Sequence, residues 1–230
     1  MKWLYLILNV FTISFPLIRS FEPKIQFATK WKFLFPAILI TGTFFITWDV
    51  FFTKAGVWGF NPDYLTGIYL LELPIEEWLF FLTVPFASIF IYECVKYFLP
   101  DTPTTQAIRW GTLGLALALV TIAAFNYTRS YTFWNFLFAS ALLILTSIRN
   151  PEWLGHFWIS YAFHLIPFLI VNGVLTGSFI EEPIVWYNNT ENLKIRLFTI
   201  PIEDTIYSLL LFLMIATLYE KFRSIKKSPM

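Results

Sequence analysis

Two pairs of acidic residues recur in the sequence, each directly after the dipeptide Pro-Ile. They form the motifs Pro74-Ile75-Glu76-Glu77 and Pro201-Ile202-Glu203-Asp204, which begin 127 residues apart. Each motif opens a long apolar stretch, and an ionisable group beside hydrocarbon is costly and is a functional candidate by default. Burial and a neighbouring carboxylate both favour the protonated form of a carboxyl group. Such a cluster can therefore supply a general acid beside a general base.

The predicted catalytic residues are Glu76, Glu77, Glu203 and Asp204. The structural alternative is that both motifs are ordinary helix starts. Proline is favoured at the first helical position, and an acid in the first turn interacts well with the helix dipole. One acid is enough for that purpose, so a pair in both motifs indicates chemistry.

Further polar and aromatic residues lie upstream of each motif. Asp49 ends an apolar stretch, and a spacing of 123 residues aligns it with Asn172. The alternative for these two is a helix cap, and for the nearby rings it is an interfacial aromatic belt. The functional interpretation is that the rings line an apolar channel and stabilise a cation through their π faces. The predicted substrate-binding residues are Asp49, Trp58, Asn61, Asn172, Trp186, Tyr187 and Asn188.

The composition of the chain indicates that these residues belong to a membrane protein. Of its 230 residues, 57% are hydrophobic and 13% are charged, which is about half the charged fraction of a typical soluble domain. A helix needs about 20 mainly apolar residues to cross the hydrocarbon core, and lipid favours helices because they pair every backbone polar group. The predicted spans are residues 3–19, 32–52, 74–95, 109–126, 131–147, 153–175 and 201–221.

The acidic motifs belong to an internal repeat. A spacing of 127 residues aligns the motifs themselves, whereas a spacing one residue longer aligns Val57-Trp58 with Val185-Trp186. The longer spacing also aligns Asn61 with Asn189. Self-similarity at a fixed spacing is the signature of repeated structural units.

We therefore predict an all-α integral membrane protein of about seven transmembrane helices. Residues 1–100 form one three-helix repeat, residues 129–230 form the second, and residues 101–128 hold a linker helix. Because an even number of spans separates corresponding helices, the repeats are parallel. Both acidic motifs then lie at the same membrane face, where four carboxyl groups can converge on one cavity.

Basic residues orient this arrangement. With seven spans, most of the 16 Lys and Arg residues fall on one side, among them Lys226 and Lys227 in the C-terminal tail. The positive-inside rule predicts an N-terminus outside and a C-terminus in the cytoplasm. The alternative, a cleaved signal peptide, is disfavoured because residues 17–21 lack a small-residue cleavage site.

Several classes of function find no support in the sequence. A net charge of +1 gives no basic field for nucleic acid. Neither a dinucleotide fingerprint nor a Walker A motif is present. A single Cys and two His residues without a ligand-spaced carboxylate give no metal set. The last span has no lysine before Lys221 for a Schiff base. We expect no cofactor and no metal.

The residues from Asp49 through Val57-Trp58-Gly59-Phe60-Asn61 to the first acidic motif resemble the lycopene cyclase domain of the non-flavin type. The second half resembles the family's second domain through Asn172-Gly173-Val174-Leu175-Thr176-Gly177 and Val185-Trp186-Tyr187-Asn188. This family occurs as two small subunits in some bacteria and as a fused chain in other bacteria and archaea. The resemblance covers nearly the whole chain, in the fused form.

The resemblance implies an enzyme that converts the linear ends of lycopene into β-ionone rings, with the acidic motifs essential. One departure is that the second motif ends in Glu203-Asp204 instead of two glutamates, which allows the two copies to differ in role. The reaction is a redox-neutral isomerisation and needs no cofactor. The resemblance also implies a bacterial or archaeal cytoplasmic membrane as the location. The expected partners are the carotenoid, membrane lipid, and either other carotenoid-pathway enzymes or a second copy.

Three alternatives stay open at this point, of which the last is a non-catalytic membrane subunit. A cyclase of another carotenoid end group, making C50, one-ring or ε-ring products, would use the same acids. A small-solute transporter of the SWEET type also has three helices, a linker helix and three more helices in parallel repeats. The transporter is less well supported, because the sequence has no Pro-Gln pair and a sugar path does not call for two acidic pairs.

Overall fold

The computed structural model describes residues 2–225, and this part of the chain contains seven α-helices. They are α1 (Leu4–Arg19), α2 (Trp31–Lys54), α3 (Ile75–Phe98), α4 (Gln106–Phe125), α5 (Ser130–Arg149), α6 (Leu154–Leu175) and α7 (Ile202–Ile225). The predicted helical class is confirmed, and the helices agree with the predicted spans to within a few residues. Lys226 and Lys227, which contributed to the predicted orientation, lie outside the described residues.

Within residues 2–225, six of the helices are long and apolar enough to cross a membrane. The exception is α1, which has 16 residues and is therefore about 24 Å long at 1.5 Å per residue. Its first turn is buried, with Leu4 and Tyr5 packed against loop residues such as Leu65 and Ile184. The first predicted span is thus a short helix whose start is covered by the protein's own loops.

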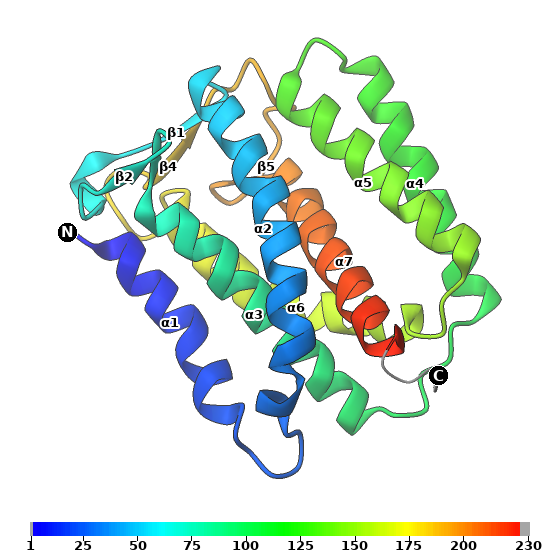
Figure 1. The fold of residues 1–230 in the computed structure, drawn as a ribbon. Coiled ribbons are helices and arrows are strands. Elements are labelled where there is room, and N and C mark those ends of the chain that lie inside the picture. The colour runs from blue at the N-terminus through cyan, green and yellow to red at the C-terminus, as the bar shows by residue number, and fades with distance from the viewer. Residues whose placement is uncertain (1, 226–230) are drawn as a thin grey trace.

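The two repeats are intertwined (Figure 1). In the first, α1 packs along α3, and in the second, α5 packs along α7. The remaining helix of each repeat crosses over, because α2 packs against α7 as well as α3, and α6 packs against α3 as well as α7. Helices α3 and α7, which carry the acidic motifs, therefore form the centre of the bundle. The linker helix α4 packs mainly on α5 at the periphery.

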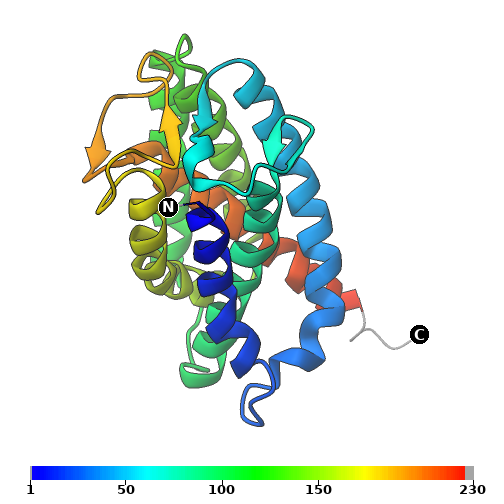
Figure 2. The ribbon, with the colours of Figure 1, turned by 90° about the vertical axis from the view of Figure 1, so that its left-hand side faces the viewer.

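Short strands, which the sequence analysis did not predict, gather at one end of the bundle (Figure 2). β1 (Trp58–Phe60) pairs with β4 (Val185–Tyr187) and so joins the repeats. The hairpin of β2 (Tyr69–Leu70) and β3 (Leu73–Pro74) leads into α3. The hairpin of β5 (Arg196–Leu197) and β6 (Ile200–Pro201) leads into α7. Both acidic motifs therefore lie at this end, as the parallel repeat predicts.

The opposite ends of α3 and α7 are joined by a buried cluster of charges. The Tyr92 hydroxyl donates to Glu220 at 2.7 Å, and by the same pattern the Tyr219 hydroxyl donates to Glu93 at 2.9 Å. These carboxylates also pair with three cations, Lys30, Lys96 and Arg223. A buried charge is tolerated only when it is paired and hydrogen-bonded. Each tyrosine thus bonds to the glutamate of the other central helix. These reciprocal bonds hold α3 and α7 together at the end away from the acidic motifs.

Candidate active site

The pairing of β1 with β4 sets the relation between the two repeats. Around these strands, the Asn61 backbone N–H donates to the Ile184 carbonyl, and the Asn188 backbone N–H donates to the Val57 carbonyl, both at 2.8 Å. These two bonds are equivalent at a spacing of 127 residues, the same spacing as that of the acidic motifs. The predicted alignment of Trp58 with Trp186 and of Asn61 with Asn189 is therefore wrong by one residue. In the structure, Asn61 corresponds to Asn188.

This one-residue difference decides which side chains point inward. Side chains alternate between the faces of a strand, and directly opposite residues share a face. The opposed pairs are Trp58 with Tyr187, Gly59 with Trp186, and Phe60 with Val185. The first and third pairs line a cavity inside the bundle. The middle pair points the other way, so Trp186, which is 44% exposed, lies over Gly59.

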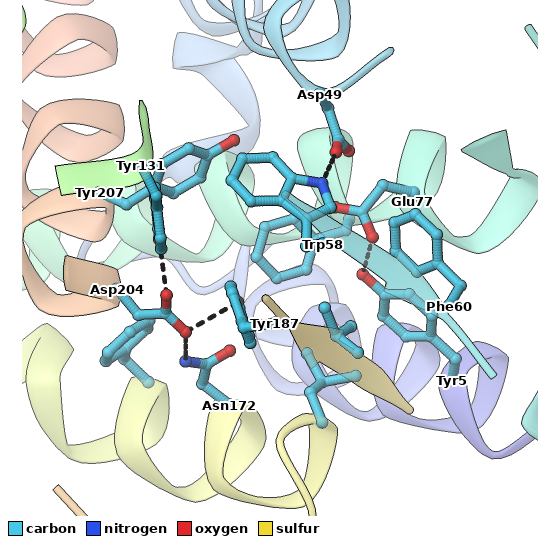
Figure 3. Close-up of a pocket in the computed structure, with 14 residues that line it drawn as sticks. Tyr5, Asp49, Trp58, Phe60, Glu77, Tyr131, Asn172, Tyr187, Asp204 and Tyr207 are labelled. Carbon is cyan, nitrogen blue, oxygen red and sulfur yellow. Dashed lines mark hydrogen bonds between the residues drawn. The ribbon is translucent and has the colours of Figure 1, made fainter. Parts of the chain in front are cut away.

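The cavity lies between the first turns of α3 and α7 and is shown in Figure 3. Its volume is about 60 Å³, which is room for a few water molecules. Six of the predicted site residues line it: Asp49, Trp58, Glu77, Asn172, Tyr187 and Asp204. The other lining residues are Tyr5, Phe60, Phe80, Tyr131, Phe168, Leu175, Val185 and Tyr207.

On one side of the cavity two carboxyl groups meet. The Tyr5 hydroxyl donates to Glu77 Oε2 at 2.5 Å. Asp49 is 1% exposed and accepts a hydrogen bond from the Trp58 indole N–H. The Asp49 and Glu77 carboxyl groups are neighbours in the wall of the cavity, and the buried Asp49 Oδ2 has no hydrogen-bond partner among residues 2–225. Two neighbouring buried carboxyl groups favour a state in which one of them is protonated, so this pair can carry a proton.

The other side of the cavity holds a single carboxyl group with three donors. Asp204 accepts from the Tyr131 hydroxyl at 2.6 Å, from the Asn172 amide at 2.7 Å and from the Tyr187 hydroxyl at 2.9 Å. Burial raises the pKa of Tyr187 well above its usual value, with the charge of Asp204 adding to the effect, so its hydroxyl stays protonated and can donate. Hydrogen bonds donated to a carboxylate stabilise its ionised form. The two sides differ because Asn172 occupies the place that Asp49 has in the first repeat.

The other two predicted catalytic acids, Glu76 and Glu203, do not line the cavity. Both are fully buried. Glu76 Oε1 accepts from the Thr66 backbone N–H and Glu203 Oε1 from the Leu193 backbone N–H, each at 2.7 Å. Adjacent helical residues point about 100° apart, so only the second acid of each motif faces the cavity. The predicted convergence of all four motif carboxyl groups on the cavity is therefore wrong. Glu77 and Asp204 line it, whereas Glu76 and Glu203 hold the loops.

Three predicted substrate-binding residues also lie outside the cavity. Asn61 Oδ1 accepts from the Asp63 backbone N–H at 3.1 Å, and Asn188 Oδ1 accepts from the Thr190 backbone N–H at 3.0 Å. Such side-chain-to-backbone bonds two residues on are typical Asx turns. Trp186 covers the outer face of β1, as described above. The structure therefore gives these residues a place in shaping the loops above the cavity.

Aromatic rings fill the space between Glu77 and Asp204 (Figure 3). The Trp58 ring meets Tyr131 edge-on at 5.1 Å between centroids, and Tyr131 stacks on Tyr187 at 5.7 Å. Tyr207 lies 6.2 Å from Trp58. The faces of such rings attract positive charge. A cation formed in this cavity would have aromatic faces on several sides and a carboxyl group at either end.

Sequence reasoning identified Tyr187 but not the other two tyrosines that donate to the cavity acids, Tyr5 and Tyr131. Tyr5 and Tyr131 stand in the same place in the two repeats, and each is followed four residues later by an asparagine, Asn9 or Asn135. These asparagines donate to the backbone carbonyls of Glu76 and Glu203 at 3.0 and 2.7 Å. The spacing Tyr-x-x-x-Asn, repeated 126 residues apart, is the signal that could have found them.

Comparison with known proteins agrees with this geometry. A family model described as lycopene cyclase matches residues 2–95 and 128–222. The chain belongs to the lycopene cyclase family. It is thus an enzyme, a carotenoid cyclase, and the matched segments hold the two repeats and omit α4. Searches of curated proteins and of solved structures gave no match. Among residues 2–225, no group of three or more His, Cys, Asp or Glu side chains is placed to hold a metal ion.

Gly59 offers a test of whether the packing of Trp186 on β1 keeps β1 paired with β4 in this lycopene cyclase family member. A Cβ atom added there would collide with the Trp186 indole, so Gly59→Ala should displace the indole or part β1 from β4. Misfits of this size cost about 1–3 kcal/mol. We expect a lower unfolding temperature in detergent, whereas Gly111→Ala in α4, where an added Cβ meets nothing within 4 Å, should be neutral or stabilising. Equal stability of Gly59→Ala and the unaltered chain would contradict this account.

Proposed function

We propose that this carotenoid cyclase is a lycopene β-cyclase, which closes the linear ends of lycopene into β-ionone rings. The observation that supports this most is the presence of two unlike acidic sites, Asp49–Glu77 and Asp204, in one aromatic-lined cavity. Ring closure needs a proton donor, stabilisation of a cation and a proton acceptor. Each requirement has a candidate group in this cavity.

The Asp49–Glu77 pair is the proton donor. Two neighbouring buried carboxyl groups favour holding one proton between them, and both line the cavity. The pair adds this proton to the terminal double bond of lycopene and produces a tertiary cation. Tyr5 and Trp58 hold the two carboxyl groups in place by donating to Glu77 and Asp49.

The aromatic rings stabilise the cation while the ring closes. The neighbouring internal double bond of lycopene attacks the tertiary cation, and a new carbon–carbon bond completes a six-membered ring. The positive charge then lies on a ring carbon. Trp58, Tyr131, Tyr187 and Tyr207 line the space in which this happens, and their π faces offset the charge without reacting with it.

Asp204 is the proton acceptor. Three hydrogen-bond donors hold it in the ionised form and fix its orientation. It removes a proton from the ring carbon beside the cation, which creates the ring double bond of the β end. One proton is added and one is removed, so the product is an isomer of the substrate and the reaction needs no redox cofactor.

The proposal places the enzyme in a cytoplasmic membrane of a bacterium or archaeon, with the N-terminus and the acid cavity at the outer face. Lycopene and membrane lipid are its partners, together with other carotenoid-pathway enzymes or a second copy of the chain. Six of the seven helices within residues 2–225 are long and apolar enough for this placement, and both acidic motifs lie at the end of the bundle that carries the N-terminus (Figure 1).

Expression of the chain in a host that accumulates lycopene tests the proposal. We expect chromatography of the extracted pigments to reveal β-ring products in place of lycopene. Unchanged lycopene, with the protein demonstrated in the membrane, would overturn it. Products with ε rings, or cyclisation only of C50 substrates, would instead assign the enzyme to another carotenoid end group.

A further inference from the structure

A groove on the membrane-facing surface leads toward the acid cavity. It lies between α1, α3 and α6 and has a volume of about 280 Å³. Its walls are almost entirely apolar and include Phe11, Phe15, Val84, Ala87, Ile91 and Pro167. Phe11 and Phe15 are each 66% exposed, so the mouth of the groove faces the position of the lipid chains.

The inner end of the groove adjoins the acid cavity. Phe80, Phe168 and Asn172 line both spaces, and Asn172 donates directly to Asp204. Other surface grooves, of about 550, 600 and 630 Å³, are larger but share no lining residue with the cavity. The residues shared with the acid cavity, and not size, distinguish the groove between α1, α3 and α6.

At the equivalent place in the other repeat, aromatic rings separate the surface groove of about 630 Å³ from the acid cavity. There, between α5, α7 and α2, Phe138 takes the place of Thr12, Phe44 that of Pro167, and Trp48 that of Val171. These three rings pack together, with centroids 5.3–6.1 Å apart. Trp48 also lies 5.2 Å from Tyr207, the counterpart of Phe80. The aromatic side chains close off the approach that the first groove leaves open.

We propose that the groove between α1, α3 and α6 is the path by which a linear polyene hydrocarbon passes from the lipid to the acid cavity. The inference rests on the proposed function, since the polyene is the substrate of that reaction. Its apolar walls suit a hydrocarbon chain, which exchanges contacts with lipid tails for van der Waals contacts with the groove and leaves no polar group unpaired. Because aromatic rings block the counterpart from the cavity, the substrate has one path and enters one end at a time.

The reacting end must also displace the side chains that separate groove from cavity. The cavity of about 60 Å³ holds a few water molecules, which is far less than the end group of a polyene. Phe80 and Phe168 are the apolar residues shared by the two spaces, so their rings move when the end group arrives. The acids are sealed from the groove until then, which keeps the protons away from the middle of the chain.

A thiol placed in the groove after folding provides the test. Ala87→Cys in a Cys94→Ala background is purified, assayed, and then treated with a small apolar reagent that attaches a benzyl group to the thiol. We expect the attached group to lower lycopene retention and ring formation by about tenfold or more, because the benzyl group occupies space that the polyene needs and removes many van der Waals contacts with the groove. The control is Leu39→Cys, at a 71% exposed position in one of the larger grooves, where the same treatment should have little effect.

The outcomes distinguish failure of the groove proposal from failure of the proposed function. If the unlabelled Ala87→Cys variant cyclises lycopene and labelling changes neither retention nor activity, the groove proposal is overturned and the function stands. If the unaltered chain forms no rings, the proposed function fails, while lycopene retained by the purified protein and lost on labelling would still support the groove.

A time course adds a second check. One-ring product should rise before two-ring product, and two-ring product appearing without it would contradict a single path.

Discussion

The Glu77→Gln variant is expected to lose ring formation by about 10²- to 10⁴-fold, the usual contribution of a general acid. An amide at this position cannot share a proton with Asp49, so the pair no longer carries the proton that the terminal double bond must receive. The Tyr5 hydroxyl, which donates to Glu77 at 2.5 Å, can still donate to the amide oxygen. The loss should therefore appear in activity, measured as pigment formed per amount of membrane protein, and not in the amount of folded protein.

Glu76→Gln is the matched control for this prediction. Glu76 is fully buried, but its Oε1 accepts only from the Thr66 backbone N–H at 2.7 Å, a role that an amide oxygen can fill. We expect this variant to keep most of its activity. An inactive Glu76→Gln beside an active Glu77→Gln would reverse the assignment that the geometry makes within this motif.

Asp204→Asn is expected to cause a loss of similar size for a different reason. In this variant the Asp49–Glu77 pair can still protonate lycopene and so form the cation. The base that removes a proton from the ring is missing. Any residual product should therefore carry its double bond at other ring positions, whereas Glu77→Gln should form no rings of any kind. Chromatography with mass spectrometry and NMR of the pigments distinguishes the two.

The matched control here is Glu203→Gln, because Glu203 accepts from the Leu193 backbone N–H and the Thr132 hydroxyl outside the cavity. We expect most of the activity to remain. Normal β-ring product from Asp204→Asn at the unaltered rate would remove Asp204 from the mechanism. A severe loss in Glu203→Gln with unchanged protein levels would indicate that the first acid of this motif acts directly.

The sequence allows good prediction of the features that depend on local patterns. Long apolar stretches predict the helices, because a chain in lipid must pair its own backbone groups. The repeated Pro-Ile-acid-acid motif predicts two equivalent helix starts at one face of the membrane. Asp49 and Asn172 were also recognised as equivalent polar positions, and both line the cavity.

The sequence did not distinguish the two acids within a motif. Glu76 and Glu77 are neighbours of the same type, and both are buried. Which of them faces the cavity depends on the rotation of α3 about its axis, and this is set by packing against α1 and by the hairpin that leads into the helix. Those contacts join residues far apart in the chain, so the local pattern does not contain them.

The amino-acid sequence by itself determined that this is a membrane-embedded, twice-repeated helical chain with acids at one face. Only the tertiary structure decided which acids meet, because a shift of one residue between β1 and β4 reverses the face of every side chain in the strand. Matching identical letters aligned Trp58 with Trp186, but hydrogen bonding places Trp58 inside and Trp186 outside. The two repeats differ in access to the cavity for the same kind of reason, since Phe44, Trp48 and Phe138 block the approach in one repeat only when distant helices bring them together.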